Sequence, residues 1–529
     1  MAGGWKRAAT AFLVLLPLLP FVPILVSILR SPWPDSAAED DAAVLELRTM
    51  EAGRGRSLVG PYSRFRFSHP GPAEFYILYP IHLLGGRRTG ALAVGAALIN
   101  GVATSLLAWL AVRFFGVRRG AALVLLHVGL LQKLDSVGLA GIWNPTITVV
   151  PFALFVFLAV AFSVGGFGYL PAAAVVASFI VQTHIGYLPA VAACSAAAVW
   201  ERARETSLGS DARRSGRALA LTLGMLVLIW LLPVIEQIRE SPGNMTLILR
   251  TFRAARAFHS FQDVFQAVSV PLTAGLLKLV ELIVPSTSDQ RAAGAGVATL
   301  LLVALLPLFR FRAARREDTP ARVLGTISIA LVAASFWSAM NVPDELHWYL
   351  FQWVSVVGLA GWGAIAMTLL GPLDEGEESP RKLFLGRAVL SGTIVVALLA
   401  TVGRIRDLRN GVGLPVDPRG NVELQELTEA VDGFLAKNGF AKPLISIASE
   451  DRWVPAAGLV LNLSKAGYRV TVDEGWWWMY GRSFRSTGRE DVGLVLGNEA
   501  LESTLGRSPD FAFVGRGSGL FVYSPRKPR

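Results

Sequence analysis

A series of long apolar runs constrains this chain more than any other feature of its sequence. Each run consists almost entirely of aliphatic, aromatic and small residues, and most approach the roughly 20 residues that an α-helix needs to cross a bilayer. We predict about 11 transmembrane helices, near residues 10–29, 90–112, 120–134, 146–164, 168–183, 186–200, 218–235, 291–310, 321–340, 349–371 and 385–402. The sequence therefore predicts an α-helical polytopic membrane protein.

The composition agrees with this prediction and excludes several other classes. Hydrophobic residues make up 53% of the 529 residues and charged residues only 17%, whereas about 25% of a soluble domain is charged. The net charge of +11 comes from arginines in short loops between apolar runs, unlike the basic face of a nucleic-acid-binding domain. Cys194 is the only cysteine, which excludes an intramolecular disulfide and a cysteine-cluster metal site.

The loop charges predict the orientation of the chain in the membrane. With the N-terminus inside, four of the five inner loops are basic, as at Arg118 and Arg119, and cytoplasmic loops are typically enriched in Lys and Arg. The first apolar run is interpreted as a retained span, because it is longer than a signal-peptide core and no small-residue cleavage site directly follows it. We predict a multi-pass protein of the cytoplasmic (inner or plasma) membrane, with its C-terminal region in the periplasm or extracellular space.

Residues 1–404 are predicted to form the transmembrane domain, with outer loops at 31–89 and 235–291. Residues 405–529 are predicted to form an extracytoplasmic α/β domain. In it "LISIAS", 444–449, and "YRVTVD", 468–473, are typical of strands, and "WVPAAGLVLNLSKAG", 453–467, is typical of a helix that a glycine ends. The run "VGLVLG" predicts another strand. "GRGSG" is interpreted as the turn of a C-terminal hairpin rather than a phosphate loop, because no helix follows it.

An acidic pair follows the first predicted span. "AEDDAAVLEL" places Asp40 and Asp41 at the start of a short amphipathic helix that is expected at the membrane surface. A carboxylate there could take a proton from an attacking hydroxyl group. The alternative is an ordinary solvated acidic loop.

The next stretch, "VGPYSRFRFSHPGPAEFY" at 59–76, combines three prolines with basic and aromatic side chains. Proline fixes φ and disfavours helix in the residue before it, so the loop is expected to be stiff. Arg64, Arg66 and His69 could bind a phosphate group, while Tyr62 belongs to a set of aromatic residues suited to a membrane interface. The alternative is an interfacial anchor that makes no substrate contact.

Other polar residues lie at predicted outer helix ends. Gln182 and His184 in "SFIVQTHIGYLP" are candidates for donor binding, and a structural histidine is the alternative. Asn144 in "GIWNP" is a possible pocket residue or a helix cap. Asp344 and His347 in "NVPDELHWY" could complete a pocket or solvate a turn.

Several chemistries lack their sequence signals. The chain has no HExxH zinc motif, no P-loop after a strand and no GxGxxG dinucleotide fingerprint. The sequence therefore requires no cofactor. A divalent cation stays undecided, and Asp40 and Asp41 would be its ligands, because hard cations prefer oxygen.

The segment "DDAAVLEL…LVGPYSRFRFSHPGPAEFYILYP" resembles a largely uncharacterised bacterial branch of the GT-C glycosyltransferases, whose first loop reads GPYSR-F-x-HPGP. The resemblance is specific over residues 40–80 and architectural over the rest of the membrane part. It implies a polytopic enzyme that uses a polyprenyl-phosphate-linked sugar as donor and an envelope glycan, lipid or protein as acceptor. Asp41 matches the first-loop acid that acts as general base. Many relatives have Asp-Glu where this chain has Asp40-Asp41, so the acting residue of the pair is left open.

The function predicted from the sequence is thus an inverting glycosyltransferase, hexosyl or pentosyl, at the outer face of the membrane. Two alternatives remain open. A transporter or flippase of lipid-linked glycans would need polar residues at mid-membrane depth, whereas the polar residues here gather at outer helix ends. A polymerase or ligase of such glycans, or a non-enzymatic assembly protein, is the other alternative.

Overall fold

The computed structural model describes residues 2–31, 38–205, 212–254, 258–281, 287–372, 380–414 and 420–526. The chain divides into two compact units. The helical unit comprises residues 1–27, 96–234 and 248–414, and the mixed unit comprises residues 28–95, 235–247 and 415–529. Each unit is described by itself.

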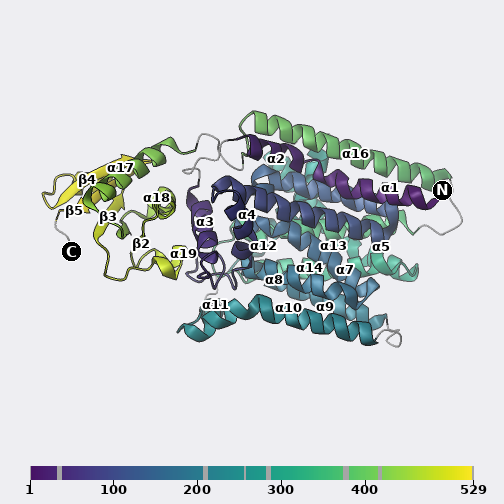
Figure 1. The fold of residues 1–529 in the computed structure, drawn as a ribbon. Coiled ribbons are helices and arrows are strands. Elements are labelled where there is room, and N and C mark those ends of the chain that lie inside the picture. Colours follow the sequence, from purple (N-terminus) through teal and green to yellow (C-terminus); the bar gives the residue numbers. More distant parts are fainter. Residues whose placement is uncertain are drawn as a thin grey trace. The chain divides into compact units, whose positions relative to one another are not determined.

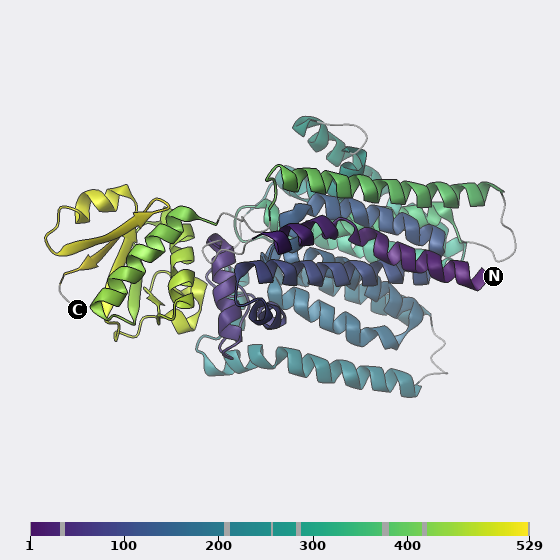
Figure 2. The same ribbon diagram turned by 45° about the horizontal axis from the view of Figure 1, so that its top comes forward.

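The helical unit is built from long apolar helices, of which α5, α10 and α16 run in a common direction in both views (Figures 1 and 2). The helices that form it, some of which extend beyond its boundaries, are α1 (Ala2–Leu15), α2 (Phe21–Arg30), α5 (Thr89–Ala140), α6 (Asn144–Ile147), α7 (Val149–Gly165), α8 (Leu170–Thr183), α9 (Leu188–Arg204), α10 (Ala212–Arg239), α11 (Asn244–Ala254), α12 (Phe261–Glu281), α13 (Ser288–Arg315), α14 (Thr319–Met340), α15 (Val354–Leu370) and α16 (Pro380–Arg409). Short 3-10 turns η1 (Leu16–Leu18), η2 (Phe167–Tyr169), η3 (Ile185–Tyr187) and η4 (Trp348–Phe351) connect several of them.

The chain is a multi-pass α-helical membrane protein. Among the described residues, 8 helices are long and apolar enough to cross a membrane, or 9 if the bent pair at 6–18 and 21–30 is one span. The prediction of about 11 counted α5 twice, and a break in helical geometry does occur at Gly116, where φ is 79°. It also counted 168–183 and 186–200, whose helices α8 and α9 have only 14 and 17 residues.

The segment 235–291 differs from its prediction as a single outer loop. It contains α12, an apolar helix of 21 residues that is long enough to cross a membrane. Charged residues at both ends of α12 hide this run in the sequence. A Cβ atom on Gly358 of α15 would overlap the carbonyl oxygen of Leu272, so glycine is what lets α12 approach α15 so closely.

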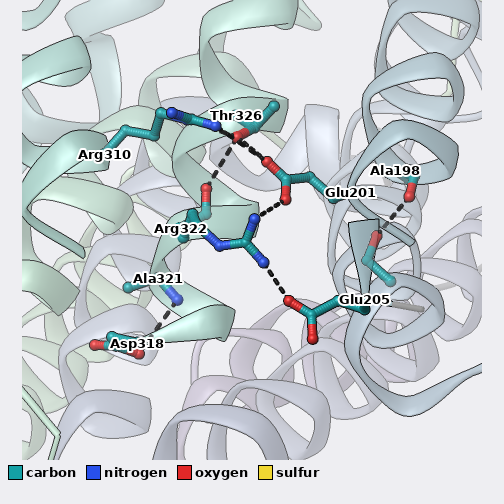
Figure 3. A network of polar contacts seen from close by, with 9 residues as sticks. Ala198, Glu201, Glu205, Arg310, Asp318, Ala321, Arg322 and Thr326 are labelled. Carbon is teal, nitrogen blue, oxygen red and sulfur yellow. Dashed lines mark hydrogen bonds and ion pairs between the residues drawn. The ribbon is translucent and has the colours of Figure 1, made fainter. Parts of the chain in front are cut away.

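A buried charge network links α9, α13 and α14 (Figure 3). Glu201 is fully buried and pairs with Arg322 and, at 3.5 Å, with Arg310. The Thr326 hydroxyl donates to Glu201 Oε1 at 2.5 Å, and Arg322 also pairs with Glu205. Arg310 lies within α13 and, with Glu201 of α9 and Arg322 of α14, helps to join three helices.

The mixed unit contains a five-stranded sheet and the helices around it. Its elements are α3 (Asp40–Ala52), α4 (Ala73–Leu84), α17 (Val422–Asn438), β1 (Pro443–Ile447), η5 (Glu450–Arg452), α18 (Trp453–Lys465), β2 (Thr471–Val472), α19 (Trp477–Tyr480), η6 (Arg482–Phe484), β3 (Val492–Gly497), α20 (Glu499–Leu505), β4 (Phe511–Gly517) and β5 (Leu520–Pro525). The strand order is β2-β1-β3-β5-β4. β1 pairs in parallel with β2 and β3, and the C-terminal hairpin β4–β5 adds antiparallel to β3.

The predicted β-α-β unit and hairpin are confirmed. α18 ends before Gly467, which has a φ of +99°. The hairpin turns at Ser518 and Gly519, both with positive φ, as two-residue hairpin turns require.

Helix α3 and the C-terminal region share one hydrophobic core. Val44 and Leu47 of α3 are buried together with Leu424 of α17 and Leu459 of α18. All of α3 from Ala43 to Ala52 is buried, so this helix packs inside the mixed unit rather than lying on the membrane surface as predicted from its amphipathic pattern. The pattern predicts the helix and its apolar side, whereas tertiary contacts determine what covers that side.

Candidate functional site

The acidic pair lies at the start of α3. Asp40 has a left-handed φ of +58°, a conformation that Asp tolerates better than most residues. Asp41 is in the first helical turn, where the helix dipole favours a negative charge. The chain thus presents two consecutive carboxylates at a helix N-terminus, with Asp40 exposed and Asp41 half-buried.

The stretch that follows folds into a tight hairpin around residues 60–69. Ser63 N–H donates to Phe67 O at 2.8 Å, His69 N–H donates to Pro61 O at 2.7 Å, and Tyr62 and Ser68 form an antiparallel bridge. These bonds give the stiffness that the prolines predict.

Tyr62 on this hairpin donates a hydrogen bond through its hydroxyl group to Asp41 Oδ1. The Tyr62 ring also packs edge-on against Trp478, with 5.5 Å between ring centroids. Trp478 is itself held by a bond from its indole N–H to Gly475 O at 2.9 Å. The candidate base is therefore oriented by a tyrosine that a tryptophan of the C-terminal region fixes in place.

A second anchor holds the other strand of the hairpin. Ser68 N–H donates to Asn244 Oδ1 at 2.9 Å, and Asn244 Nδ2 donates back to Ser68 O at 2.7 Å. Asn244 N–H donates to Glu236 Oε2 at 2.9 Å, and Glu236 pairs with Arg482 at 3.2 Å. Two segments distant in sequence thus fix the hairpin from one side.

The surroundings change the pKa of the Asp40 carboxyl group and of the Tyr62 hydroxyl group. Partial desolvation raises the pKa of Asp40, while a bond from the backbone N–H of Asp41 opposes this rise. Burial and the Asp41 charge raise the pKa of the Tyr62 hydroxyl, which keeps it protonated as a donor. The raised pKa is that of Asp40, and it would bring that carboxylate closer to the basicity that proton abstraction needs near neutral pH.

The three predicted phosphate ligands have different environments. Arg66 lies at the exposed hairpin tip, with a left-handed φ of +62°. Arg64 is half-buried, and its guanidinium lies 5.0 Å from the centre of the Phe65 ring. His69 is buried and packs edge-on against Phe67. The hairpin thus holds all three near Tyr62, with Arg66 the most accessible.

Two buried carboxylates lie outside the predicted set of site residues, although Glu46 belongs to the predicted acidic stretch "AEDDAAVLEL". Glu46, one turn and a half after Asp41, is fully buried and accepts bonds from His82 at 3.0 Å and Thr89 at 2.6 Å. It also pairs with Lys465 at 2.7 Å. Glu74 is fully buried, and neither of its oxygens has a hydrogen-bond partner in the described part of the chain. Both lie within the segment that carries the GT-C resemblance, which is the signal that could have identified them.

The remaining predicted residues belong to the helical unit. Gln182 is buried and donates to Ile229 O at 2.9 Å. His184 is also buried, and its Nδ1 accepts from Gly186 N–H at 3.2 Å. Asn144 is the first residue of α6 and donates to Thr183 O at 3.4 Å. These bonds bring Asn144 beside the end of α8, and each residue has a structural role there.

Asp344 and His347 lie on the loop between α14 and η4. His347 stacks on Tyr349 with 5.5 Å between ring centroids, and Tyr349 lies against Trp143, the residue before Asn144. A cavity of about 600 Å³ adjoins this loop and is lined by Lys133, His259, Asp263, Glu345 and Gln352, among others. Within the helical unit, the loop of Asp344 and His347 therefore lies close to Asn144, which in turn lies beside the end of α8, where Gln182 and His184 are found.

No group of three or more His, Cys, Asp or Glu side chains in the described residues is arranged to hold a metal ion. Asp40 and Asp41 alone would supply two carboxylates toward such an ion.

No protein-family model matches the sequence, and no curated protein sequence matches it either. Among solved structures, the chain is similar to ArnT from Cupriavidus metallidurans bound to undecaprenyl phosphate, with a TM-score of 0.58 and 13% identity over 99% of this chain and 98% of that one. For ArnT in the apo state the TM-score is 0.56, with 14% identity over 98% of each chain. At this identity the likeness shows the fold alone, so the chain has a fold similar to that of ArnT.

Proposed function

We propose that this chain is a membrane glycosyltransferase that moves a sugar from a polyprenyl-phosphate donor to a hydroxyl group of a cell-envelope acceptor. The reaction takes place at the outer face of the cytoplasmic membrane, with the N-terminus inside. The observation that carries the proposal is the hydrogen bond from Tyr62 to Asp41 at the start of α3. A catalytic carboxylate needs such a fixed orientation, and a surface acid does not.

The donor class is supported by the fold. A protein of the same fold, ArnT, has been solved with undecaprenyl phosphate bound. The long apolar helices of this chain suit a substrate with a polyprenyl tail. Whether the sugar is a hexose or a pentose stays open.

In the proposed mechanism Asp41 is the general base. The acceptor hydroxyl transfers its proton to Asp41 while its oxygen forms a bond to the anomeric carbon of the donor sugar. The bond between that carbon and the phosphate oxygen breaks, and the polyprenyl phosphate leaves with the electron pair. A single displacement of this kind inverts the anomeric centre. Phosphate is a good leaving group, so a second carboxylic acid is less needed than in glycosidases.

Basic groups near the departing phosphate would stabilise its charge. Arg64, Arg66 and His69 share the hairpin with Tyr62, and an arginine fork can bind phosphate through two hydrogen bonds. Within the helical unit, Gln182 and His184 are proposed to contact the donor, and Asn144, Asp344 and His347 are proposed pocket residues of that unit. Their packing as described shows a structural role as well.

Turnover by the purified protein in nanodiscs tests the proposal. A panel of polyprenyl-phosphate sugars is supplied with envelope glycans as acceptors, and release of free polyprenyl phosphate is measured. We expect Asp41→Asn to lower kcat by about 10²–10⁴-fold, the usual contribution of a general base. Glu499→Gln is the matched control, because Glu499 is also an acid in a first helical turn of the mixed unit but is exposed.

Three outcomes separate the possibilities. If Asp40→Asn is the inactive variant and Asp41→Asn retains activity, the base is Asp40 and the mechanism is otherwise unchanged. If both acids can be replaced without loss of turnover, the acidic pair is not catalytic. If no donor turns over but a lipid-linked sugar crosses proteoliposome membranes, the chain is a transporter.

A further inference from the structure

The mixed unit contains a basic cavity that the proposed reaction does not use. Its volume is about 870 Å³, within the range of roughly 300–1,000 Å³ that is usual for small-molecule sites and more than a single phosphate group requires. It is lined by the end of α3 with the turn that follows, the end of α18, the start of β2, and η6 with the loop before β3. Residues of the outer loop and of the C-terminal region thus contribute to one cavity.

Five cationic side chains line this cavity and only two acidic ones. The cations are Arg54, Arg56, Lys442, Arg469 and Arg489, and the acids are Glu51 and Glu490. No ion pair involves the last three of these cations in the described part of the chain. An excess of unpaired positive charge in a concave site attracts an anionic ligand, because the cavity walls focus the field.

The other two cations are held in place by Glu51. The Glu51 side chain is buried, and its Oε1 accepts from Arg54 Nη1 at 2.7 Å. The backbone N–H groups of Arg54 and Arg56 both donate to Glu51 O, at 3.1 and 2.9 Å. This turn therefore fixes the backbone of both arginines at the cavity, and the Arg54 side chain is also held by its bond to Glu51.

Glu51, one of the lining residues, also has an acceptor without a hydrogen bond. Its Oε2 accepts no hydrogen bond from the described residues, and it forms an ion pair with Arg56 Nη1 at 3.8 Å. A buried acceptor without a donor is costly, and a ligand hydroxyl group would satisfy it. Tyr468 and Phe484 add aromatic surface to the lining. Cations alone would suit any anion, whereas an acceptor and aromatic rings beside them suit a carbohydrate.

We propose that this cavity binds an acidic glycan, a carbohydrate that carries carboxylate or phosphate groups. The cations bind its acidic groups, Glu51 accepts from a sugar hydroxyl, and Tyr468 supports a sugar face. This inference rests on the proposed function in one respect: it makes the acidic glycan the class of acceptor that Asp41 acts on.

Binding to the full-length protein in nanodiscs of neutral lipid tests the inference without any donor. Tetragalacturonate is the acidic probe, and maltotetraose is the neutral probe of equal length. We expect salt-dependent binding of tetragalacturonate and no binding of maltotetraose at the same concentration. The double variant Arg469→Glu/Arg489→Glu should weaken binding by at least about tenfold, since it replaces two attractive charges by two repulsive ones.

The control is Arg507→Glu/Arg516→Glu, which makes the same charge change at exposed arginines of the mixed unit that do not line the cavity. Equal loss in both double variants would overturn the inference, because binding would then depend on total charge alone. Absence of tetragalacturonate binding to the wild type at low salt would also overturn it. A third contradicting result would be that the protein binds phosphatidylglycerol vesicles through Arg469 and Arg489 and that tetragalacturonate does not compete with this binding. That result would assign the cavity to lipid headgroups. All of these outcomes are independent of turnover.

Discussion

Removal of the Lys465 ammonium group is the sharpest test of how the mixed unit is held together. Lys465 Nζ lies 2.7 Å from Glu46 Oε1, and the exposed fractions of the two side chains are 13% and 0%. Lys465→Met keeps most of the aliphatic stem but leaves a buried carboxylate with one cation fewer. Breaking a buried ion pair in this way costs about 3–5 kcal/mol. The N-terminal helix α3 and the C-terminal helix α18 would then be joined by apolar contacts alone at this point.

The assay is thermal unfolding of the full-length protein in detergent, followed by tryptophan fluorescence. Trp453 lies on the same helix as Lys465, so the reporter belongs to the affected unit. At about 2–4 °C per kcal/mol for a unit of this size, Tm should fall by roughly 10 °C. Arg485→Met is the control, because it breaks an ion pair with Glu474 at 3.0 Å in the same unit, where both side chains are more than half exposed. Such a pair contributes little to stability.

The pH dependence gives a second check on the same group. Burial by itself would raise the pKa of Glu46, but the hydrogen bond from His82 and the charge of Lys465 bring it below its ordinary value. The stability that this carboxylate contributes is therefore present above pH 4.5 and is lost as pH falls through the lower folded pKa. Glu46→Gln should remove that loss. Equal, small Tm changes for Lys465→Met and Arg485→Met would refute the reasoning.

Three further predictions concern the hairpin and its surroundings. Tyr62→Phe keeps the ring but removes the hydrogen bond to Asp41, so kcat should fall. The acidic limb of the pH–rate profile should also move to higher pH, because a carboxylate that loses a donor becomes more basic. An unchanged profile would contradict the role of Tyr62. Burial raises the pKa of Glu74 well above its usual range, so the folded protein is most stable below pH 4.5 and loses stability as pH rises. Glu74→Gln should remove this pH dependence from Tm values measured between pH 4 and 8. A pH dependence that persists in the variant would contradict the assignment. Gly481 has a φ of +104°, and a Cβ atom there would overlap the buried Arg48, whereas a Cβ atom on Gly488, with a φ of +71°, would have open space. Gly481→Ala should therefore lower the free energy of unfolding by about 2 kcal/mol more than Gly488→Ala. Equal losses in a denaturant titration would contradict the packing described.

Much of the candidate site could be predicted because its residues are close together in sequence. The stiff hairpin follows from Pro61, Pro70 and Pro72, whose restricted φ acts locally. The acids at the start of α3 follow from the pattern that begins that helix. The bond from Tyr62 to Asp41 could not be predicted, because it depends on how the hairpin folds back on α3 and on the packing of Tyr62 against Trp478.

The sequence by itself determined which segments are helical and apolar, that the chain crosses a membrane, and that a β-α-β unit and a hairpin lie near its C-terminus. These features depend on periodicity and turn chemistry over a few residues. Only the tertiary structure decided that α3 is buried against α18, that Glu46 meets Lys465, and that α12 packs among the long helices. Such contacts join residues that are far apart in the sequence, and they are selected by the free energy of burying surfaces that fit together. A local pattern contains no information about which distant surface will cover it.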